Sequence, residues 1–158
     1  MPNVPMVLDP VLAAEAGGSL GDASVPDALI TELLPRATLT TPNLPEAQRL
    51  AGAEDIASCG ETLLQYGCPA VLITGTHDNT DQVHNHLFHG DQPRQWSWPR
   101  LDGSFHGSGC TLASACTALL AQGHPIEQAL TIAQDYVHQA LKNAWQAGQG
   151  QLIPDRRG

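Results

Sequence analysis

Apolar positions along the chain alternate between short continuous runs and helical stripes. The runs have the length of buried strands and end at proline, glycine or aspartate. They occupy residues 4–10, 37–43 and 70–75. Elsewhere apolar residues recur every three or four positions, which is typical of helices with one buried face. This spacing predicts helices at 24–35, 43–52, 54–67, from near Gly109 to Gly123, and 125–144.

Residues 82–99 show a third pattern, with two alternating stretches on either side of Gly90 and Asp91. Such a pattern predicts an antiparallel hairpin. Strands that alternate with helices predict an α/β fold, with a mostly parallel sheet covered by helices on both faces and the hairpin at one edge. We expect one domain over residues 1–150, followed by a mobile tail at 151–158.

Composition narrows the classes of function. The 158 residues are 42% hydrophobic and 15% charged, as in a globular domain that needs no disulfides, and no apolar run approaches the length of a membrane span. A formal charge of -9 with only seven Lys and Arg argues against a broad surface for nucleic acid or anionic membrane. The four cysteines lack CxxC spacing, so we expect reduced thiols in a cytoplasmic protein.

The segment GSFHGSGCTLASACTALLAQG, residues 103–123, carries the strongest candidate chemistry. A helix that begins near Gly109 has unpaired backbone N–H groups and a partial positive charge at its start. Gly107, Ser108 and Gly109 would let an anion approach those groups, and the same dipole would lower the pKa of the Cys110 thiol. A thiolate there can accept a proton from a substrate hydroxyl. The alternative is a tight loop before a packed helix, with Cys110 as a buried hydrophobe.

Three further residues follow predicted strands. Asp9 ends the first strand, and Asn43 and Glu46 follow the second. In an open α/β sheet, loops at the carboxyl ends of the strands converge on the ligand, so we expect these residues to meet the Gly107–Cys110 segment. A purely structural interpretation remains for each: an N-cap with a first-turn carboxylate for Asn43 and Glu46, and an Asx-turn for Asp9.

The histidines of the hairpin allow a separate interpretation. His84, His86 and the nearby His89 would place two imidazoles on one face of a strand, where a pair can bind zinc. The sequence suggests no third or fourth ligand. We therefore expect a polar face of the hairpin rather than a zinc site.

Three motifs together resemble a known family. HGSGCTLASA at 106–115, VLDPV at 7–11 and TPNLPEAQRL at 41–50 are similar to segments of the hydroxymethylpyrimidine/phosphomethylpyrimidine kinases of thiamin biosynthesis, in the ribokinase-like superfamily. The resemblance implies ATP-dependent phosphorylation of 4-amino-5-hydroxymethyl-2-methylpyrimidine and then of its monophosphate. It also implies that Gly107, Ser108 and Gly109 form the anion hole and that Cys110 is the base.

The resemblance implies further roles for residues in the first half of the chain. It assigns Mg²⁺ and phosphate to Asp9, Asn43 and Glu46, the pyrimidine pocket to Val11, and the nucleotide site to Thr74, Gly75 and Thr76. Many family members carry a lysine where Thr74 stands, so one phosphate contact differs here. Pyridoxal kinase-like activity and a truncated, non-catalytic nucleotide-binding module are the alternatives.

The resemblance covers only the C-terminal portion of a typical member, because the chain opens at the family's middle strand and lacks the N-terminal part of the substrate site. The strand at 4–8 should therefore lie at an edge of the sheet, with unpaired backbone groups and apolar side chains. Such an edge needs a cover. We expect either a homo-oligomer or a piece of a longer product, with a small-molecule substrate and neither nucleic acid nor membrane as partner.

Overall fold

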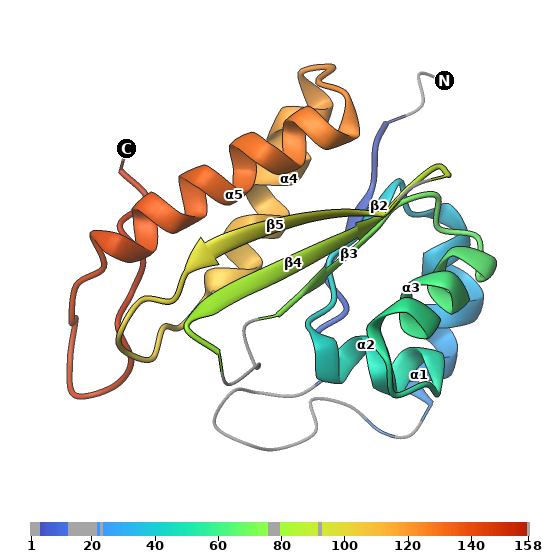
Figure 1. Ribbon diagram of the computed structural model, residues 1–158, viewed down its shortest axis with the longest axis horizontal. Helices are drawn as coiled ribbons and strands as arrows, with labels where there is room; N and C mark the ends of the chain where they lie inside the picture. The colour runs from blue at the N-terminus through green and yellow to red at the C-terminus, as the bar shows by residue number, and fades with distance from the viewer. Residues whose placement is uncertain (1–3, 13–21, 23, 76–79, 92, 158) are drawn as a thin grey trace. The chain divides into compact units, whose positions relative to one another are not determined.

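The computed structural model describes residues 4–12, 22, 24–75, 80–91 and 93–157. The chain divides into two compact units, Met6–Pro99 and a second unit made of Met1–Pro5 with Arg100–Gly158. The first unit contains all the strands of the sheet, and the second contains the last two helices, as Figure 1 shows.

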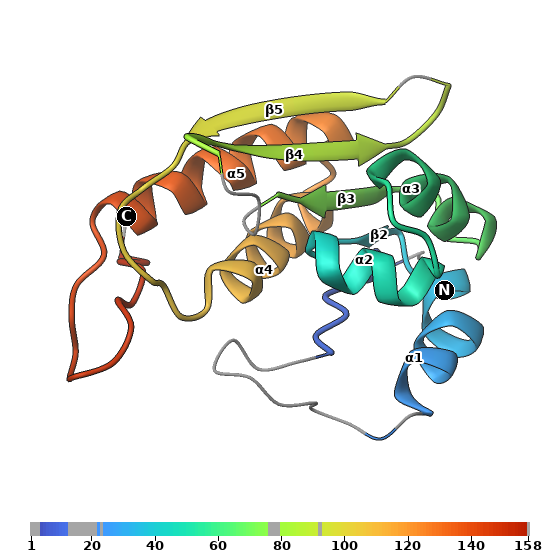
Figure 2. The same cartoon turned by 60° about the horizontal axis from the view of Figure 1, so that its bottom comes forward.

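The sheet of the first unit has five strands in the order β1-β2-β3-β4-β5 (Figure 2). β1, β2 and β3 are parallel neighbours, whereas β4 runs antiparallel to both β3 and β5. The mixed sheet with an antiparallel hairpin at one edge is therefore confirmed. The strands are β1 (Val7–Leu8), β2 (Leu39–Thr40), β3 (Val71–Thr74), β4 (Gln82–Phe88) and β5 (Arg94–Pro99).

The strand β1 lies at the other edge of the sheet. Its pairing is with β2, where Val7 is opposite Leu39 and Leu8 is opposite Thr40. Within the described residues β1 has no second neighbour in the sheet. The expectation that the first strand forms an edge is therefore confirmed, and both its side chains are only half-buried.

Three helical segments of this unit lie on one face of the sheet (Figure 2). α1 (Val25–Ala28) continues as a π-helical turn at Leu29–Leu33 and a 3-10 turn at Leu34–Arg36, so the predicted helix is present but irregular towards Pro35. α2 (Leu44–Ala51) begins at the cap Asn43 and ends at Gly52, whose φ of 63° is left-handed and favours glycine. α3 (Ile56–Gln65) begins after Asp55.

The core of this unit lies between these helices and the sheet. Val71, Ile73 and Phe88 of the sheet pack against a cluster that includes Leu50 and Leu63. Each fully buried aliphatic side chain contributes about 1.5–3 kcal/mol relative to an exposed one. The opposite face of the sheet is also buried, at Leu39, Leu72 and Leu87. Apolar residues at successive strand positions are therefore buried, as the continuous apolar runs predict.

The second unit consists of an antiparallel helix pair and the C-terminal segment. α4 (Ser108–Ala121) and α5 (Ile126–Lys142) lie side by side, joined at Gly123 (Figure 1). The expected mobile tail is instead tied down: Leu152 bridges Phe105, and Ile153 bridges Trp145. Backbone groups of this segment are hydrogen-bonded to Ser104, Trp145 and Ala140. None of the helices in the described part of the chain is long and apolar enough to span a membrane.

Candidate functional site

The start of α4 is open along its backbone. Gly107 is the N-cap, with φ 83° and ψ 18°, and it gives the helix no side-chain cap. The first hydrogen bond of the helix runs from the Thr111 N–H to the Gly107 carbonyl (3.0 Å), so the N–H groups of Ser108 and Gly109 precede it. A Cβ added at Gly109 would meet no heavy atom within 4 Å. This geometry suits an anion hole, and that role stays a prediction.

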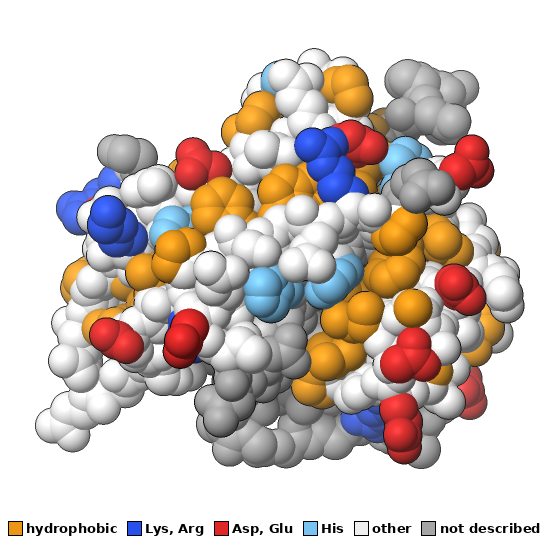
Figure 3. All heavy atoms as spheres, in the orientation of Figure 1, with side chains coloured by type: hydrophobic (Ala, Val, Ile, Leu, Met, Phe, Trp, Pro, Cys, Tyr) orange, Lys and Arg blue, Asp and Glu red, His pale blue; other side chains and the backbone are white. Residues whose placement is uncertain are grey.

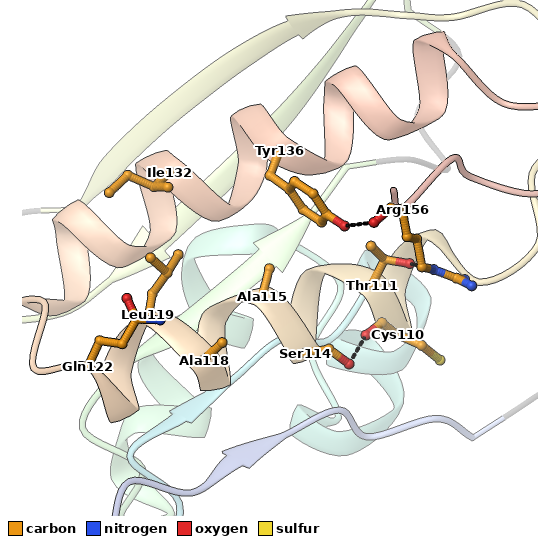
Figure 4. Close-up of a pocket in the computed structure, with 10 residues that line it drawn as sticks. All are labelled: Cys110, Thr111, Ser114, Ala115, Ala118, Leu119, Gln122, Ile132, Tyr136 and Arg156. Atoms are coloured by element: carbon orange, nitrogen blue, oxygen red, sulfur yellow. Dashed lines mark hydrogen bonds between the residues drawn. The ribbon is translucent and has the colours of Figure 1, made fainter. Parts of the chain in front are cut away.

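Cys110 is the exposed thiol of the chain. It lines a cavity of about 660 Å³ between α4 and α5, with Cys110 and Arg156 at one end and Gln122 at the other (Figure 4). Cys59, Cys68 and Cys116 are buried, and burial raises the pKa of each thiol, that of Cys116 to about 12. The interpretation of Cys110 as a buried hydrophobe is therefore wrong.

The pattern of apolar residues gave no indication of Arg156, which lies beside the start of α4. Its Nε donates a hydrogen bond to Thr111 Oγ1 (2.9 Å), and that hydroxyl donates to the Gly107 carbonyl (2.6 Å). Its terminal nitrogen Nη2 would lie 2.8 Å from a Cβ placed on Gly107. Composition alone could have drawn attention to Arg156, because the chain has only seven Lys and Arg beside sixteen Asp and Glu.

In the first unit, Asn43 and Glu46 form a capping box at the start of α2. The Glu46 N–H donates to Asn43 Oδ1, and the Asn43 N–H donates to Glu46 Oε2, both at 2.9 Å. The structural interpretation of this pair is thus confirmed. It leaves room for a second role, because a capping carboxylate keeps further lone pairs for water or a cation.

Asp9 lies close to this capping box. Burial raises the pKa of Glu46, the N–H groups of Asn43 and Leu12 oppose the rise, and the negative charge of Asp9 adds to it. The carboxyl ends of β1 and β2 therefore bring two carboxylates together, as expected. Asp9, Asn43 and Glu46 thus lie near one another within the first unit, and their expected meeting with the Gly107–Cys110 segment stays a prediction.

This donor set fits Mg²⁺. The ion prefers oxygen ligands and usually takes one or two carboxylates while keeping several waters. Asp9 and Glu46 supply two carboxylates whose negative charges act on one another. No group of three or more His, Cys, Asp or Glu within the described ranges could hold a metal, so a closed protein cage is not present there. His84 instead contacts Ser97 Oγ (2.9 Å) across the hairpin, which agrees with the polar-face interpretation.

The end of β3 adjoins Asn43. The Thr74 N–H donates to the Pro42 carbonyl (2.9 Å), and Thr74 bridges Asn43. The Gly75 N–H donates to Oδ1 of Asn85 (3.2 Å), a buried side chain of β4 that sequence reasoning missed. Alternation predicted that strand but gave no reason to single out Asn85. Thr76 lies outside the described residues.

Two more residues flank these loops. Val11 is 42% exposed, and its N–H donates to the Asp9 carbonyl (3.0 Å), so a side chain expected in a pyrimidine pocket is accessible. Thr41, just before Pro42, is 5% exposed, and its Oγ1 has no hydrogen-bond partner among the residues the structure describes. A buried hydroxyl without a partner is uncommon and calls for an explanation such as a ligand or water.

Comparison with solved structures identifies the class. Pyridoxal kinase from Staphylococcus aureus in complex with ADP matches with a TM-score of 0.88 and 31% identity, over 96% of this chain and 58% of that one. Phosphomethylpyrimidine kinase from Clostridium difficile matches with a TM-score of 0.72 and 29% identity, over 87% and 58%. The architecture is thus the ribokinase-like α/β fold.

Sequence comparison identifies the family within that class. The profile of phosphomethylpyrimidine kinases matches residues 1–155, and the chain belongs to this family. The hydroxymethylpyrimidine/phosphomethylpyrimidine kinase of Bacillus subtilis is 38% identical over 92% of this chain and 56% of that relative. A thiamine biosynthesis bifunctional protein of Geobacter sulfurreducens is 37% identical over 92% of this chain and 31% of that relative. The chain therefore spans less than two thirds of the length of these relatives.

Proposed function

We propose that residues 1–150 form a kinase domain that binds ATP and Mg²⁺. The domain transfers the γ-phosphoryl group to 4-amino-5-hydroxymethyl-2-methylpyrimidine and then to its monophosphate. Family membership supports this proposal, as do relatives solved with ADP and with AMP-PCP. The observation that carries it is the open, glycine-capped start of α4 with the exposed Cys110 thiol in its first turn.

The proposed chemistry assigns one task to each group at α4. The N–H groups of Ser108 and Gly109 donate to the transferring phosphoryl and stabilise its negative charge. The hydroxymethyl oxygen attacks the γ-phosphorus, a new P–O bond forms, and the bond to the β-phosphate oxygen breaks to release ADP. The Sγ of Cys110, as the thiolate, takes the hydroxyl proton.

The remaining residues bind and position the reactants in this proposal. Asp9 and Glu46 hold Mg²⁺ through water, with Asn43 fixing the Glu46 carboxylate by the capping box. When bound, the ion neutralises phosphate charge. Thr74, Gly75 and Thr76 border the nucleotide, and Val11 contacts the pyrimidine.

The test is turnover by the purified chain. The chain is incubated with ATP, Mg²⁺ and hydroxymethylpyrimidine, and ADP and both pyrimidine phosphates are measured by mass spectrometry. Cys110→Ala should abolish phosphoryl transfer and leave ATP binding intact, because the thiol acts on the acceptor's proton. Thr117→Ala, an exposed position two turns further along α4, is the control and should keep wild-type turnover. Full turnover by Cys110→Ala would refute the role of the thiol as base.

A second substrate deserves the same assay. Pyridoxal kinases of S. aureus and B. subtilis match with TM-scores of 0.88 and 0.83, above that of the C. difficile phosphomethylpyrimidine kinase. Pyridoxal is therefore offered in parallel, and the ratio of the two specificity constants decides the substrate. Calorimetric binding of ATP without turnover of either acceptor would favour the non-catalytic module instead.

The exposed edge at β1 supports the proposal of a homo-oligomer. A two-residue edge strand with half-buried apolar side chains is a template for pairing with another chain. Light scattering coupled to size exclusion gives the mass in solution. A monomer at micromolar concentration would refute this part of the proposal.

A further inference from the structure

The C-terminal segment is anchored to the loop before α4 and to α5. The His106 N–H donates to the Leu152 carbonyl (2.9 Å), which ties the segment to the loop that leads into α4. The Asp155 N–H donates to the Ala140 carbonyl (2.9 Å), and the Tyr136 hydroxyl donates to the Arg156 carbonyl (3.1 Å), which tie it to α5. The backbone at Arg156 is therefore held by α5, as Figure 4 shows for Tyr136, and the segment before it is held by the loop that leads into α4.

The guanidinium of Arg156 is oriented as well as anchored. Its Nε is held by Thr111 Oγ1 at 2.9 Å, and the same hydroxyl is held by the Gly107 carbonyl at 2.6 Å. The hydrogen bond at Nε leaves both terminal nitrogens available, and Nη2 lies close to Gly107, 2.8 Å from where a Cβ would stand. A side chain at position 107 would displace that nitrogen, so the N-cap glycine serves Arg156 as well as the backbone turn.

This arrangement places a cation at the positive end of a helix. The macrodipole of α4 disfavours a guanidinium there. Within the described part of the chain no carboxylate pairs with Arg156, whereas the adjacent Arg157 binds both oxygens of Asp155 at 2.8 and 2.9 Å. An anion held between the guanidinium and the α4 amides would remove the repulsion, because both would donate to it.

We infer that Arg156 binds the phosphate groups of the nucleotide together with the first turn of α4. The inference rests on the proposed function and extends it, by adding a charged side chain to a site so far made of backbone amides and a thiol. Arginine suits the task because its planar fork can donate to two phosphate oxygens at once. It also compensates for charge in a chain with only seven Lys and Arg.

The test compares two neighbouring arginines and two ligands. Arg156→Gln is compared with Arg157→Gln, and affinities for ADP and for adenosine are measured by calorimetry on the full chain with Mg²⁺. Arg156→Gln should weaken ADP binding by about tenfold or more and leave adenosine binding unchanged, because only ADP carries the phosphates. Arg157→Gln should alter neither affinity. Arg156→Lys keeps the charge without the fork and should lie between.

Each outcome decides a different point. Equal ADP affinity in wild type and Arg156→Gln would overturn the inference and leave the proposed function standing. Parallel loss of ADP and adenosine binding, or a lower melting temperature in Arg156→Gln, would assign Arg156 a structural role only and also overturn it. Absence of ADP binding by the wild-type chain would overturn the proposed function and the inference with it.

Discussion

Replacing Gly109 by alanine separates the structural role of the α4 start from its proposed phosphate role. Gly109 lies in the first turn of the helix, and a Cβ built there meets no heavy atom within 4 Å. The substitution therefore causes no clash inside the protein. It places a methyl group in the open space through which an anion would approach the backbone.

The expected effects on stability and on function have opposite signs. Alanine is favoured over glycine in helices by about 0.5–1 kcal/mol, and for a chain of this size each kcal/mol raises the melting temperature by roughly 2–4 °C. Removing one donor from an oxyanion hole costs on the order of 100-fold in turnover, so a methyl that holds the phosphoryl away from the amides should cost about tenfold or more. Gly109→Ala should therefore be more stable and less active.

Melting temperature by calorimetry and turnover with ATP measure the two effects on the same samples. Gly148→Ala is the matched control, because its Cβ would also have no neighbour within 4 Å and it lies outside both helices. It should change neither quantity by as much. A Gly109→Ala protein that keeps full turnover would refute the anion hole at α4. A less stable one would refute the packing argument.

Three more predictions address the thiols and Thr41. Iodoacetamide at pH 8 should modify only Cys110 in the native protein and all four cysteines in urea, as read by intact mass; native labelling of Cys116 would contradict its burial. Burial raises the pKa of Cys116 from about 9 to about 12, so the unfolded state loses this proton first. The free energy of unfolding should therefore fall as pH rises from about 9 towards 12, and Cys116 contributes up to about 1.4 kcal/mol per pH unit. In urea titrations the slope should be shallower in Cys116→Ala than in wild type, because Cys59 and Cys68 alone then contribute, and equal slopes would contradict the raised pKa of Cys116. Thr41→Val should be as stable as wild type or more stable by about 1 kcal/mol, because it removes a buried hydroxyl without a partner, yet it should lower turnover if that hydroxyl binds substrate; unchanged turnover would make Thr41 a structural residue only.

Local chemistry explains why parts of the fold could be predicted. Asn43 caps α2 and Gly52 ends it because a capping side chain and a left-handed glycine act on their own backbone neighbours. The buried strands are recognisable because successive residues along them are apolar and buried. The irregular turns at Leu29–Arg36 were not predicted, since the apolar spacing there is compatible with several helical geometries.

The missed site residues depend on contacts between distant parts of the chain. Arg156 reaches Thr111 across 45 positions, and Asn85 reaches Gly75 from a neighbouring strand. The spacing of apolar and polar residues along the sequence indicates neither contact. Asp9 and Glu46 could be predicted to meet because parallel strands end at the same edge, which is a property of the fold rather than of one pair.

The charge of the chain limits how it can hold a polyphosphate. With a formal charge of -9, the chain repels an anionic ligand at long range. On the face in Figure 3, the basic side chains of the described residues form no broad patch. The proposed function therefore relies on short-range groups, which are the α4 amides and the Arg156 guanidinium in one unit and a cation at the carboxylates of Asp9 and Glu46 in the other. Each of these acts only on an anion already in contact. Affinity should therefore depend on Mg²⁺ and on single residues at these positions more than on ionic strength, because few free charges steer the ligand from a distance.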